Sequence, residues 1–571
     1  MKLPKVSERN IYIAAAVLFF IGLHVYTVFS ILYDFKWAIF SIVILGLAHI
    51  TWIYLLLSYV FADHKEALFG AISDAFEKLF SYQIKGFAVV PVALSILLPV
   101  GFLAWLLLDS DGNYGRLKSL VAIPVYIILC VIVSANPAKI KWRPVIGGFV
   151  LQIAVGIIVL RWSPGHEALS YLSKKVVGFL DFTKAGTTFN FGFIAAPPNI
   201  CGMGLVFLYT SLQIIIYFAA VVSILNYFGI IGFILSKIAI VMQYTVGTTA
   251  AESLNAAACI FLGQTEAAIL IEPALASMTE SEVHAVMTAG FACIAGSLFS
   301  AYISFGAQPA YLLSATVMNA SVSLAISKLV YPEIQQSRQK DARSFQFKGS
   351  DGKSLLQLVS EAACHSSRLV MDIGVNLIVY IALLAFLNEA VAYAGDCIGI
   401  ADLSFNKLLG YCFFPLAYLM GASDAPDAKT QVQECLRVAE LMGMKTVLNE
   451  FIAYQRLKEM VAEGTLKGAR AQMIATYALC GFSNISTIGS QLGILGSMCP
   501  WRRGVFSKLI VRALFAGSVS CFVTASVAGI LVSKPLEWTA SGDSHCFDPN
   551  AHLGGNLTTT VLPSIFTSTV A

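Results

Sequence analysis

The chain has 571 residues, of which 57% are hydrophobic and 12% are charged, and its formal net charge is +4. A soluble domain carries about 25% charged residues, so this composition excludes a soluble domain and predicts a protein that lies in a lipid bilayer. The small net charge gives no reason to expect a nucleic-acid partner. The twelve cysteines are scattered without a Cys-x-x-Cys pair or a zinc-type histidine spacing, so we expect neither a metal site of that kind nor a cofactor.

Apolar runs recur along the chain, each close to the roughly 20 residues that a helix needs to cross about 30 Å of hydrocarbon. They predict an all-α polytopic membrane protein with about eleven transmembrane helices. In chain order the expected spans are Ile11–Leu32, Trp37–Phe61, Gly86–Leu108, Leu120–Val133, Val145–Leu160, Leu205–Phe228, Val286–Phe305, Leu369–Ala390, Leu408–Met420, Met473–Ile494 and Leu509–Val532.

Charges beside the spans predict the orientation of the chain. Lys2, Lys5 and Arg9 precede the first span, and the loop at residues 139–143 is also basic. The positive-inside rule places both segments in the cytoplasm, and an odd number of spans then places the C-terminus outside the cell. A sequon begins at Asn556 in that tail, so we expect Asn556 to be a glycosylation site of a plasma-membrane protein.

Shifts in composition divide the chain into successive regions. The segment Trp162–Asn199 is amphipathic and interrupted by Pro and Gly, which suits a helix at the membrane interface. The segment Tyr331–Leu355 is polar and of mixed charge, which suits a linker. We therefore predict accessory transmembrane helices in residues 1–118, scaffold helices and the interfacial helix in 119–200, a first repeat in 201–330, a polar linker in 331–368, a second repeat with the last helices in 369–532, and an extracellular tail in 533–571.

Polar side chains interrupt the apolar sequence in both repeats. Gly263–Glu266 is followed, about thirty residues later, by a span interrupted at Ile294–Ser297, and Leu448–Phe451 is followed in the same way by an interruption at Cys480–Asn484. A charge at membrane depth costs about 2.5–3.5 kcal/mol, and free backbone groups survive there only where they line a cavity. The pattern predicts an inverted repeat with two re-entrant helical hairpins and two broken helices, as in transporters. For one break alone, a kink with a satisfied polar residue is the alternative.

The segments around these breaks also resemble a known family. They are Gly247–Ser253, Gly263–Glu266, Met287–Gly306, Asn449–Tyr454 and Ala478–Asn484. In this order they are similar to the signatures of the concentrative nucleoside transporters. The match extends from about Pro144 to about Gly529, and the leading spans resemble the extra N-terminal helices of the eukaryotic members.

The resemblance implies a homotrimer that takes up nucleosides such as uridine or adenosine by cation-coupled symport, with an elevator-type displacement of a transport domain. It also implies the roles of the site residues. Gln264, Thr265 and Glu266 would meet the nucleobase and Leu298 would pack on it, whereas Glu450 would accept the ribose hydroxyls and Asn484 and Thr487, with Phe482 close by, would complete the sugar contacts.

The chemistry of these residue types fits the implied roles. A carboxylate such as Glu450 only accepts hydrogen bonds, through two oxygens, so it suits the two neighbouring hydroxyls of a ribose. The amide of Gln264 both donates and accepts, so it suits a nucleobase edge. For Glu252 we favour a structural role as a partner of backbone amides in the first hairpin.

The coupling ion is left open between H⁺ and Na⁺. In the resembling sodium-coupled members, an Asn stands five residues before the hairpin Gln and a Ser or Thr five before the apolar base contact. Here these positions are Cys259 and Cys293, and a thiol is a poor ligand for a hard cation. Sodium would then rely on carbonyls near Leu262 and Ile294, so a proton carried by a membrane-embedded carboxylate is a serious rival.

Two other functions remain as alternatives. A symporter for another polar solute would use the same broken helices, but an anionic solute would require a fixed cation, and the site residues here are acids and amides. An intramembrane enzyme is disfavoured because the sequence has no His-Glu-x-x-His motif and no Gly-x-Ser-x-Gly elbow in a span.

Overall fold

The computed structural model describes residues 8–33, 83–84, 87–88, 104–109, 115–197, 206–337, 354–400 and 403–536, with a few single positions between 38 and 101. The chain divides into two compact units, Met1–Asp109 and Ser110–Ala571. In the first unit, α1 (Glu8–Tyr33) is helical, and β1 (Gln83–Ile84) pairs antiparallel with β2 (Phe87–Ala88). The predicted spans Trp37–Phe61 and Gly86–Leu108 lie largely outside the described residues, and Asn556 lies wholly outside them.

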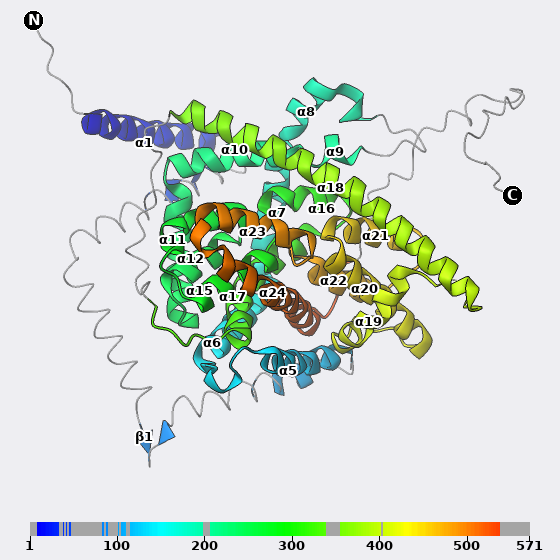
Figure 1. Ribbon diagram of the computed structural model, residues 1–571. Helices are drawn as coiled ribbons and strands as arrows, with labels where there is room; N and C mark the ends of the chain where they lie inside the picture. Colours follow the sequence, from blue (N-terminus) through cyan, green and yellow to red (C-terminus); the bar gives the residue numbers. More distant parts are fainter. Residues whose placement is uncertain are drawn as a thin grey trace, which may run out of the picture. The chain divides into compact units, whose positions relative to one another are not determined.

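The regular elements of the second unit are all helices within the part of the chain that is described (Figure 1). Its first part contains α5 (Gly115–Val133), η1 (Pro137–Lys139), α6 (Trp142–Gly156), the π-helical turn η2 (Ile157–Arg161), α7 (Ser163–Leu180), α8 (Thr183–Phe191), η3 (Gly192–Ile194), α9 (Phe207–Thr210), α10 (Ile214–Tyr227), α11 (Ile230–Val246), α12 (Ala250–Ala258), α13 (Gln264–Leu270), α14 (Glu272–Leu275), α15 (Glu280–Ala292), η4 (Gly296–Leu298), α16 (Phe299–Ser304) and α17 (Pro309–Val330).

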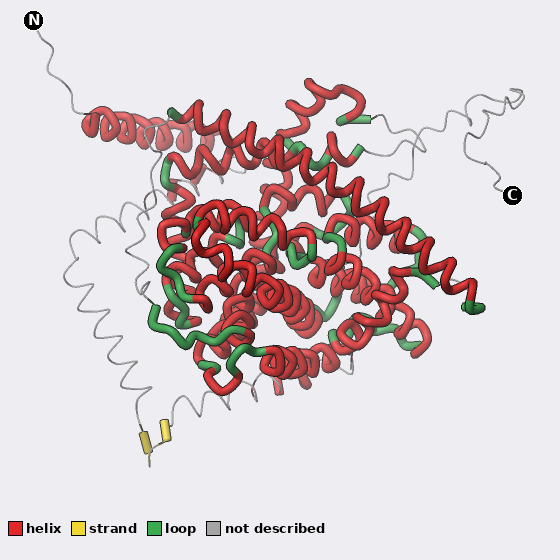
Figure 2. The backbone as a smooth tube through the Cα atoms, viewed as in Figure 1, coloured by secondary structure: helices red, strands yellow, loops and turns green. Residues whose placement is uncertain are grey.

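The remaining helices follow the order of the preceding ones. In both parts a long apolar segment leads to a pair of helices joined by a short turn, then to a helix with a break, then to a buried helix. Figure 2 shows the described helices in red and the loops that join them in green. The helices of the second part are α18 (Leu355–Cys397), α19 (Phe405–Leu419), α20 (Ala428–Val447), α21 (Glu450–Ala462), α22 (Ala469–Leu479), α23 (Ser486–Met498), η6 (Pro500–Arg502) and α24 (Arg503–Leu531).

Helices α17 and α24 form the centre of the second unit, and α24 packs on α15, α17 and α22. Both are rich in small residues, which allow helices to approach closely: a Cβ added at Gly517 would lie 2.5 Å from the Cβ of Phe291. The sequence did not predict α17 as a span because serines lower its hydropathy. The structure shows hydroxyls of this helix bonding within the helix itself, as Ser323 does to the carbonyl of Ala320, so these polar groups are satisfied in a buried position.

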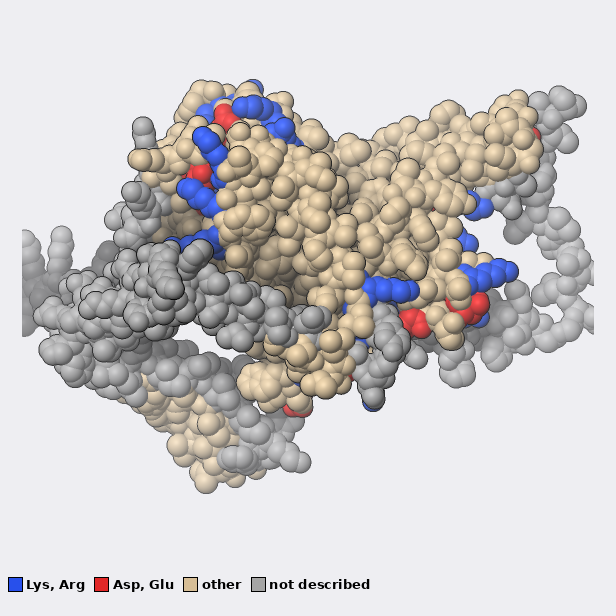
Figure 3. Space-filling view, turned by 90° about the horizontal axis from the view of Figure 1, so that it is seen from below, with Lys and Arg blue, Asp and Glu red and all other residues tan. Residues whose placement is uncertain are grey.

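The surface of the second unit is broadly apolar. Among the described residues, six helices are long and apolar enough to cross a membrane, and large side chains such as Phe233, Tyr244 and Ile378 are exposed. On the face seen in Figure 3, charged residues form small groups between wide uncharged areas. This distribution fits a protein whose apolar surface faces lipid.

Two buried arginines hold the end of α24. Arg116 donates two hydrogen bonds to the carbonyl of Ile530, at 2.9 and 2.7 Å, and Arg470 donates to the carbonyls of Gly529 (3.0 Å) and Gly421 (2.7 Å). The last carbonyls of a helix have no partner inside that helix. These arginines therefore satisfy groups that would otherwise be costly to bury.

Candidate functional site

Two pairs of helices meet in polar turns. Helix α13 begins at Gln264 and carries Glu266 in its first turn. Helix α21 begins at Glu450, and Asn449 caps it by accepting a hydrogen bond from the backbone of Ile452 at 3.0 Å. Acids and amides favour the first turn because they complement the free N–H groups and the positive end of the helix. The polar runs seen in the sequence are therefore the places where a second helix starts.

The two broken helices contact each other at their breaks. Helix α15 ends at Ala292, and Cys293 is extended before the chain turns into η4. The backbone N–H of Phe482, in the break between α22 and α23, donates to the carbonyl of Cys293 at 3.0 Å. Gly481 permits this approach, because a Cβ there would lie 2.6 Å from Cys521 Sγ and 3.0 Å from the carbonyl of Ala292.

Buried side chains satisfy backbone groups that the breaks set free. Asn319 of α17 donates to the carbonyls of Ala292 (2.8 Å) and Cys480 (3.0 Å), one on each broken helix. Lys445 donates to the carbonyl of Ala478 at 2.9 Å and has no exposed surface. Irregular backbone at membrane depth requires such partners, so these residues stabilise the helix breaks.

Replacing Asn319 with Leu is expected to destabilise the protein by about 2 kcal/mol, because two buried carbonyls lose a donor. The melting temperature of the purified protein in detergent should fall accordingly. Ser323→Ala is the matched control on the same helix, since this hydroxyl bonds only to its own helix, and it should leave the melting temperature nearly unchanged. Equal melting temperatures for Asn319→Leu and wild type would show that Asn319 does not support the breaks.

A cavity of 420 Å³ lies where the turns and breaks converge, within the about 300–1,000 Å³ usual for small-molecule sites. It brings together all eight residues that the sequence suggests for substrate binding. It is also lined by Asp372, Asn376 and Tyr380 from α18, which the sequence did not suggest. Their spacing of four residues on one helix face was the available signal. The eight suggested residues are Gln264, Thr265, Glu266, Leu298, Glu450, Phe482, Asn484 and Thr487.

A hydrogen-bond network fixes the carboxylate of Glu450 in the wall of this cavity. Its Oε2 accepts from Asn484 Nδ2 at 2.7 Å, and its Oε1 accepts from the hydroxyl of Tyr302 at 3.3 Å. Asn484 Oδ1 accepts from the backbone N–H of Thr487 at 2.9 Å. Because an N–H can only donate, this contact sets the orientation of the Asn484 amide. The site therefore presents a pre-positioned, buried acceptor.

The cavity wall also carries an acceptor without a partner among the described residues, on Gln264. Oε1 of Gln264 is shielded from solvent and makes no hydrogen bond with the residues that the structure describes. Leu298, only 5% exposed, lines the same cavity. Buried acceptors are rarely left without a donor, so Gln264 and Leu298 suit a ligand that donates a hydrogen bond and has an apolar face.

The candidate ion ligands lie beside the cavity and do not line it. Cys259 and Cys293 are buried free thiols. The Cys259 sulfur accepts a weak bond from Asn255 Nδ2 at 3.9 Å, and the Cys293 thiol donates to the carbonyl of Gly290 at 3.3 Å. Leu262, three residues after Cys259, and Ile294, directly after Cys293, are also buried.

Glu252 has the structural role that the sequence favours, and it has a second partner. Its Oε1 accepts from the backbone N–H of Thr249 at 2.7 Å, which caps α12. Its Oε2 lies 2.8 Å from Nζ of Lys328, and both side chains are buried. Lys328 also lies 3.6 Å from the carboxylate of Glu333 and donates to Ser281 at 3.0 Å. The sequence did not single out Lys328.

Comparisons with known proteins agree with this architecture. Three family models match the chain: "Na+ dependent nucleoside transporter N-terminus" over residues 121–194, "Nucleoside recognition" over 208–309, and "Na+ dependent nucleoside transporter C-terminus" over 311–529. Sodium/nucleoside cotransporter 1 of Sus scrofa is 42% identical over 445 residues, which cover 76% of this chain and 66% of the relative. Solute carrier family 28 member 3 of Homo sapiens is 37% identical over 494 residues, 84% of this chain and 69% of the relative.

The chain thus spans about two thirds of the length of these curated relatives. Among solved structures, CNTnw in an inward-facing substrate-bound state superposes with a TM-score of 0.68 at 31% identity, covering 73% of this chain and 98% of CNTnw. The order of the motifs, the fold and the relatives all indicate the same family. The chain belongs to the concentrative nucleoside transporter family, whose members are transporters and not enzymes.

Proposed function

We propose that this chain is a sodium-coupled nucleoside symporter of the plasma membrane. The observation that carries the proposal is the 420 Å³ cavity at which two polar helix starts and two broken helices converge, and which acids and amides line. Free backbone ends and polar side chains are found together at membrane depth where a polar solute is bound. The relatives named as sodium/nucleoside cotransporters support this choice of solute.

In this proposal the ribose binds at Glu450. Both carboxylate oxygens already accept hydrogen bonds from the protein, but each retains acceptor capacity for one hydroxyl of the sugar. The hydroxyl of Thr487 donates to the carbonyl of Phe482 at 2.6 Å, so its oxygen lone pairs remain as acceptors. The protein thus offers acceptors to a ligand that is rich in hydroxyl donors.

The nucleobase then lies toward Gln264, Thr265 and Glu266. The unpartnered Oε1 of Gln264 would accept from a base N–H, and its amide nitrogen would donate to a base carbonyl or ring nitrogen. Leu298 supplies the apolar contact for the base. Purines and pyrimidines both present such edges, so this geometry accepts nucleosides of both kinds.

The charges of the cavity favour neutral substrates. Glu266, Glu450 and Asp372 line it, and no Lys or Arg is among its described lining residues. Uridine 5′-monophosphate should therefore inhibit uridine uptake at least about 100-fold more weakly than uridine, since an unpaired charge at membrane depth costs about 2.5–3.5 kcal/mol. Competition assays with 5′-deoxyuridine control for the lost hydroxyl. Equal inhibition by the monophosphate and the nucleoside would refute the charge argument.

Sodium is the proposed coupling ion, with carbonyl oxygens near Leu262 and Ile294 in place of side-chain ligands at Cys259 and Cys293. The relatives that are sodium/nucleoside cotransporters support sodium, and backbone oxygens are suitable ligands for a hard cation. One cation entering with a neutral nucleoside gains about 2.3 kcal/mol per 100 mV. That is sufficient for roughly fiftyfold accumulation.

We further propose the architecture of a homotrimer with about eleven transmembrane helices, in which α12–α13 and α20–α21 are re-entrant hairpins of an inverted repeat. The N-terminus would be cytoplasmic and the C-terminus extracellular. Alternating access would be of the elevator type. CNTnw and its variants have been solved in inward-facing, outward-facing and intermediate states, which supports a large displacement during transport.

Uptake of radiolabelled uridine and adenosine into proteoliposomes tests the proposal. We expect accumulation above equilibrium with an inward sodium gradient at fixed pH, and none with an inward proton gradient in sodium-free buffer. Accumulation with protons alone would replace sodium by H⁺ as the coupling ion. No uptake under either gradient, with protein correctly inserted, would contradict nucleoside transport.

A further inference from the structure

A second cavity lies next to the first. It has a volume of 580 Å³ and is almost wholly apolar, with the rings of Phe207, Phe305 and Phe451 in its wall and Gln455 as the single polar residue among its described lining residues. The rings of Phe207 and Phe305 stack at 5.0 Å, and Phe207 meets Phe451 edge-on at 5.9 Å. Nothing in the proposed transport of a plain nucleoside uses this space.

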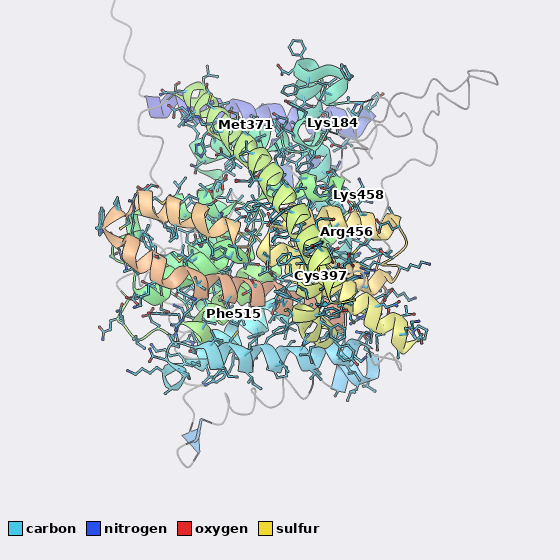
Figure 4. The ribbon with its side chains drawn as sticks, turned by 45° about the vertical axis from the view of Figure 1, so that its right-hand side comes forward. Lys184, Met371, Cys397, Arg456, Lys458 and Phe515 are labelled. Atoms are coloured by element: carbon cyan, nitrogen blue, oxygen red, sulfur yellow. The ribbon has the colours of Figure 1, made fainter. Side chains whose placement is uncertain are left out.

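Helix α18 separates the two cavities. Asp372, Asn376 and Tyr380 lie on the face toward the first cavity, whereas Met371, Ile378 and Ala382 line the second. Figure 4 shows Met371 on this helix. Each group follows the three- to four-residue spacing of one helix face. The polar residues that α18 contributes all line the first cavity, together with apolar ones, whereas its residues in the second cavity are Gly, Ala and apolar side chains.

The two cavities share part of their walls. Val375, Leu377 and Phe451 line both, and Phe451 directly follows Glu450 in the chain. Because Glu450 is the residue that would accept the ribose hydroxyls, the apolar space begins beside the proposed sugar site, and none of the three shared residues belongs to the Gly263–Glu266 turn. A substituent on the sugar could therefore extend past the side chain of Phe451.

We propose that the second cavity is an apolar subsite for nucleosides that carry an apolar substituent on the 5′ oxygen; this rests on the proposed nucleoside function. The 5′ oxygen is the position of choice because substitution at the 2′ or 3′ oxygen would remove hydroxyls assigned to Glu450. Such compounds bind tightly because their chains leave water for an apolar wall. They compete with uridine, since their sugar and base occupy the first cavity.

The test is a series of 5′-O-alkyl uridines, from methyl to hexyl, assayed as inhibitors of radiolabelled uridine uptake in proteoliposomes. Each buried methylene should lower the inhibition constant about threefold to fourfold. A matched series with the alkyl chain on C5 of the base should gain no such increment, because the base is assigned to Gln264, Thr265 and Glu266, and none of these lines the second cavity. The slope of a series is the change in the logarithm of the inhibition constant for each added methylene. Comparing slopes, and not single compounds, removes the effect of losing the 5′ hydroxyl.

Cavity-filling variants test where the alkyl substituent binds. Ala382→Phe and, independently, Ala385→Phe place a ring in the second cavity and should flatten the slope of the 5′-O-alkyl series while uridine uptake continues. Val379→Phe is the control on the same helix, because Val379 lines neither cavity and is 49% exposed; its slope should match wild type.

Each result is decisive. If added methylenes do not lower the inhibition constant of the wild-type protein, while uridine itself competes normally, the subsite proposal is wrong. A lipid chain is then the expected occupant of the second cavity. A steep slope that neither cavity-filling variant changes also overturns it, because partitioning into the membrane or another site then explains the gain. Absence of any uridine uptake contradicts the proposed function itself, and the subsite falls with it.

Discussion

Glu450→Gln is expected to reduce uridine uptake by at least about 100-fold. A buried carboxylate that accepts from sugar hydroxyls forms charge-assisted bonds worth about 1.5–3 kcal/mol each, and the neutral amide loses this for two hydroxyls. The amide of Asn484 adds a second constraint. Its Nδ2 donates to Glu450 and its Oδ1 is engaged by Thr487 N–H, so the substituted side chain must turn its amide oxygen toward Asn484 and present N–H groups elsewhere.

The measurement is initial uptake into proteoliposomes, normalised to inserted protein. Glu459→Gln is the matched control, because it makes the same chemical change on the same helix at a side chain that is 46% exposed. It should transport at close to the wild-type rate. If Glu450→Gln transports normally while the protein is folded, the assignment of the ribose to Glu450 is wrong.

Lys328→Met is expected to destabilise the folded protein by about 3–5 kcal/mol, the usual cost of removing one partner of a buried ion pair. Lys328 lies within 2.8 Å of Glu252 and 3.6 Å of Glu333, and its side chain is 6% exposed. Methionine leaves both carboxylates without their cation. The purified variant should lose monodispersity in detergent at a temperature well below that of wild type.

A second substitution separates this effect from a packing defect. Lys328→Met combined with Glu252→Gln removes the uncompensated charge of Glu252 while keeping its shape, so it should recover much of the lost stability. The neutral amide can still accept from the backbone of Thr249, as Glu252 does now. A double variant as unstable as the sum of the single variants would show that the pair is not coupled.

The polar turns and breaks could be predicted from the sequence because the signal is local. An acid and an amide inside an apolar run, as at Gln264 and Glu266, are costly unless they serve a site, and the glycine-containing interruptions at Gly296 and Gly481 stand out against regular spans. The structure places these segments around one cavity, and it confirms helix breaks at both interruptions. The roles of the individual side chains stay a prediction.

The supporting residues could not be predicted, because their partners are distant in sequence. Asn319 lies 161 residues from Cys480, whose carbonyl it satisfies, and locally it forms only a sequon without consequence in an apolar helix. Nothing in the sequence singles out Lys328, and its pairing with Glu252 appears only in the fold. Tyr302, which donates to Glu450, likewise looks like an ordinary core aromatic.

The structure of the purified protein with bound uridine, determined by electron cryomicroscopy in sodium-containing buffer, tests the central claim most directly. We predict density for the nucleoside in the 420 Å³ cavity, with the ribose hydroxyls at Glu450 and the base edge at Gln264. Uridine bound elsewhere, or bound with its base at Glu450, would contradict this account of the site.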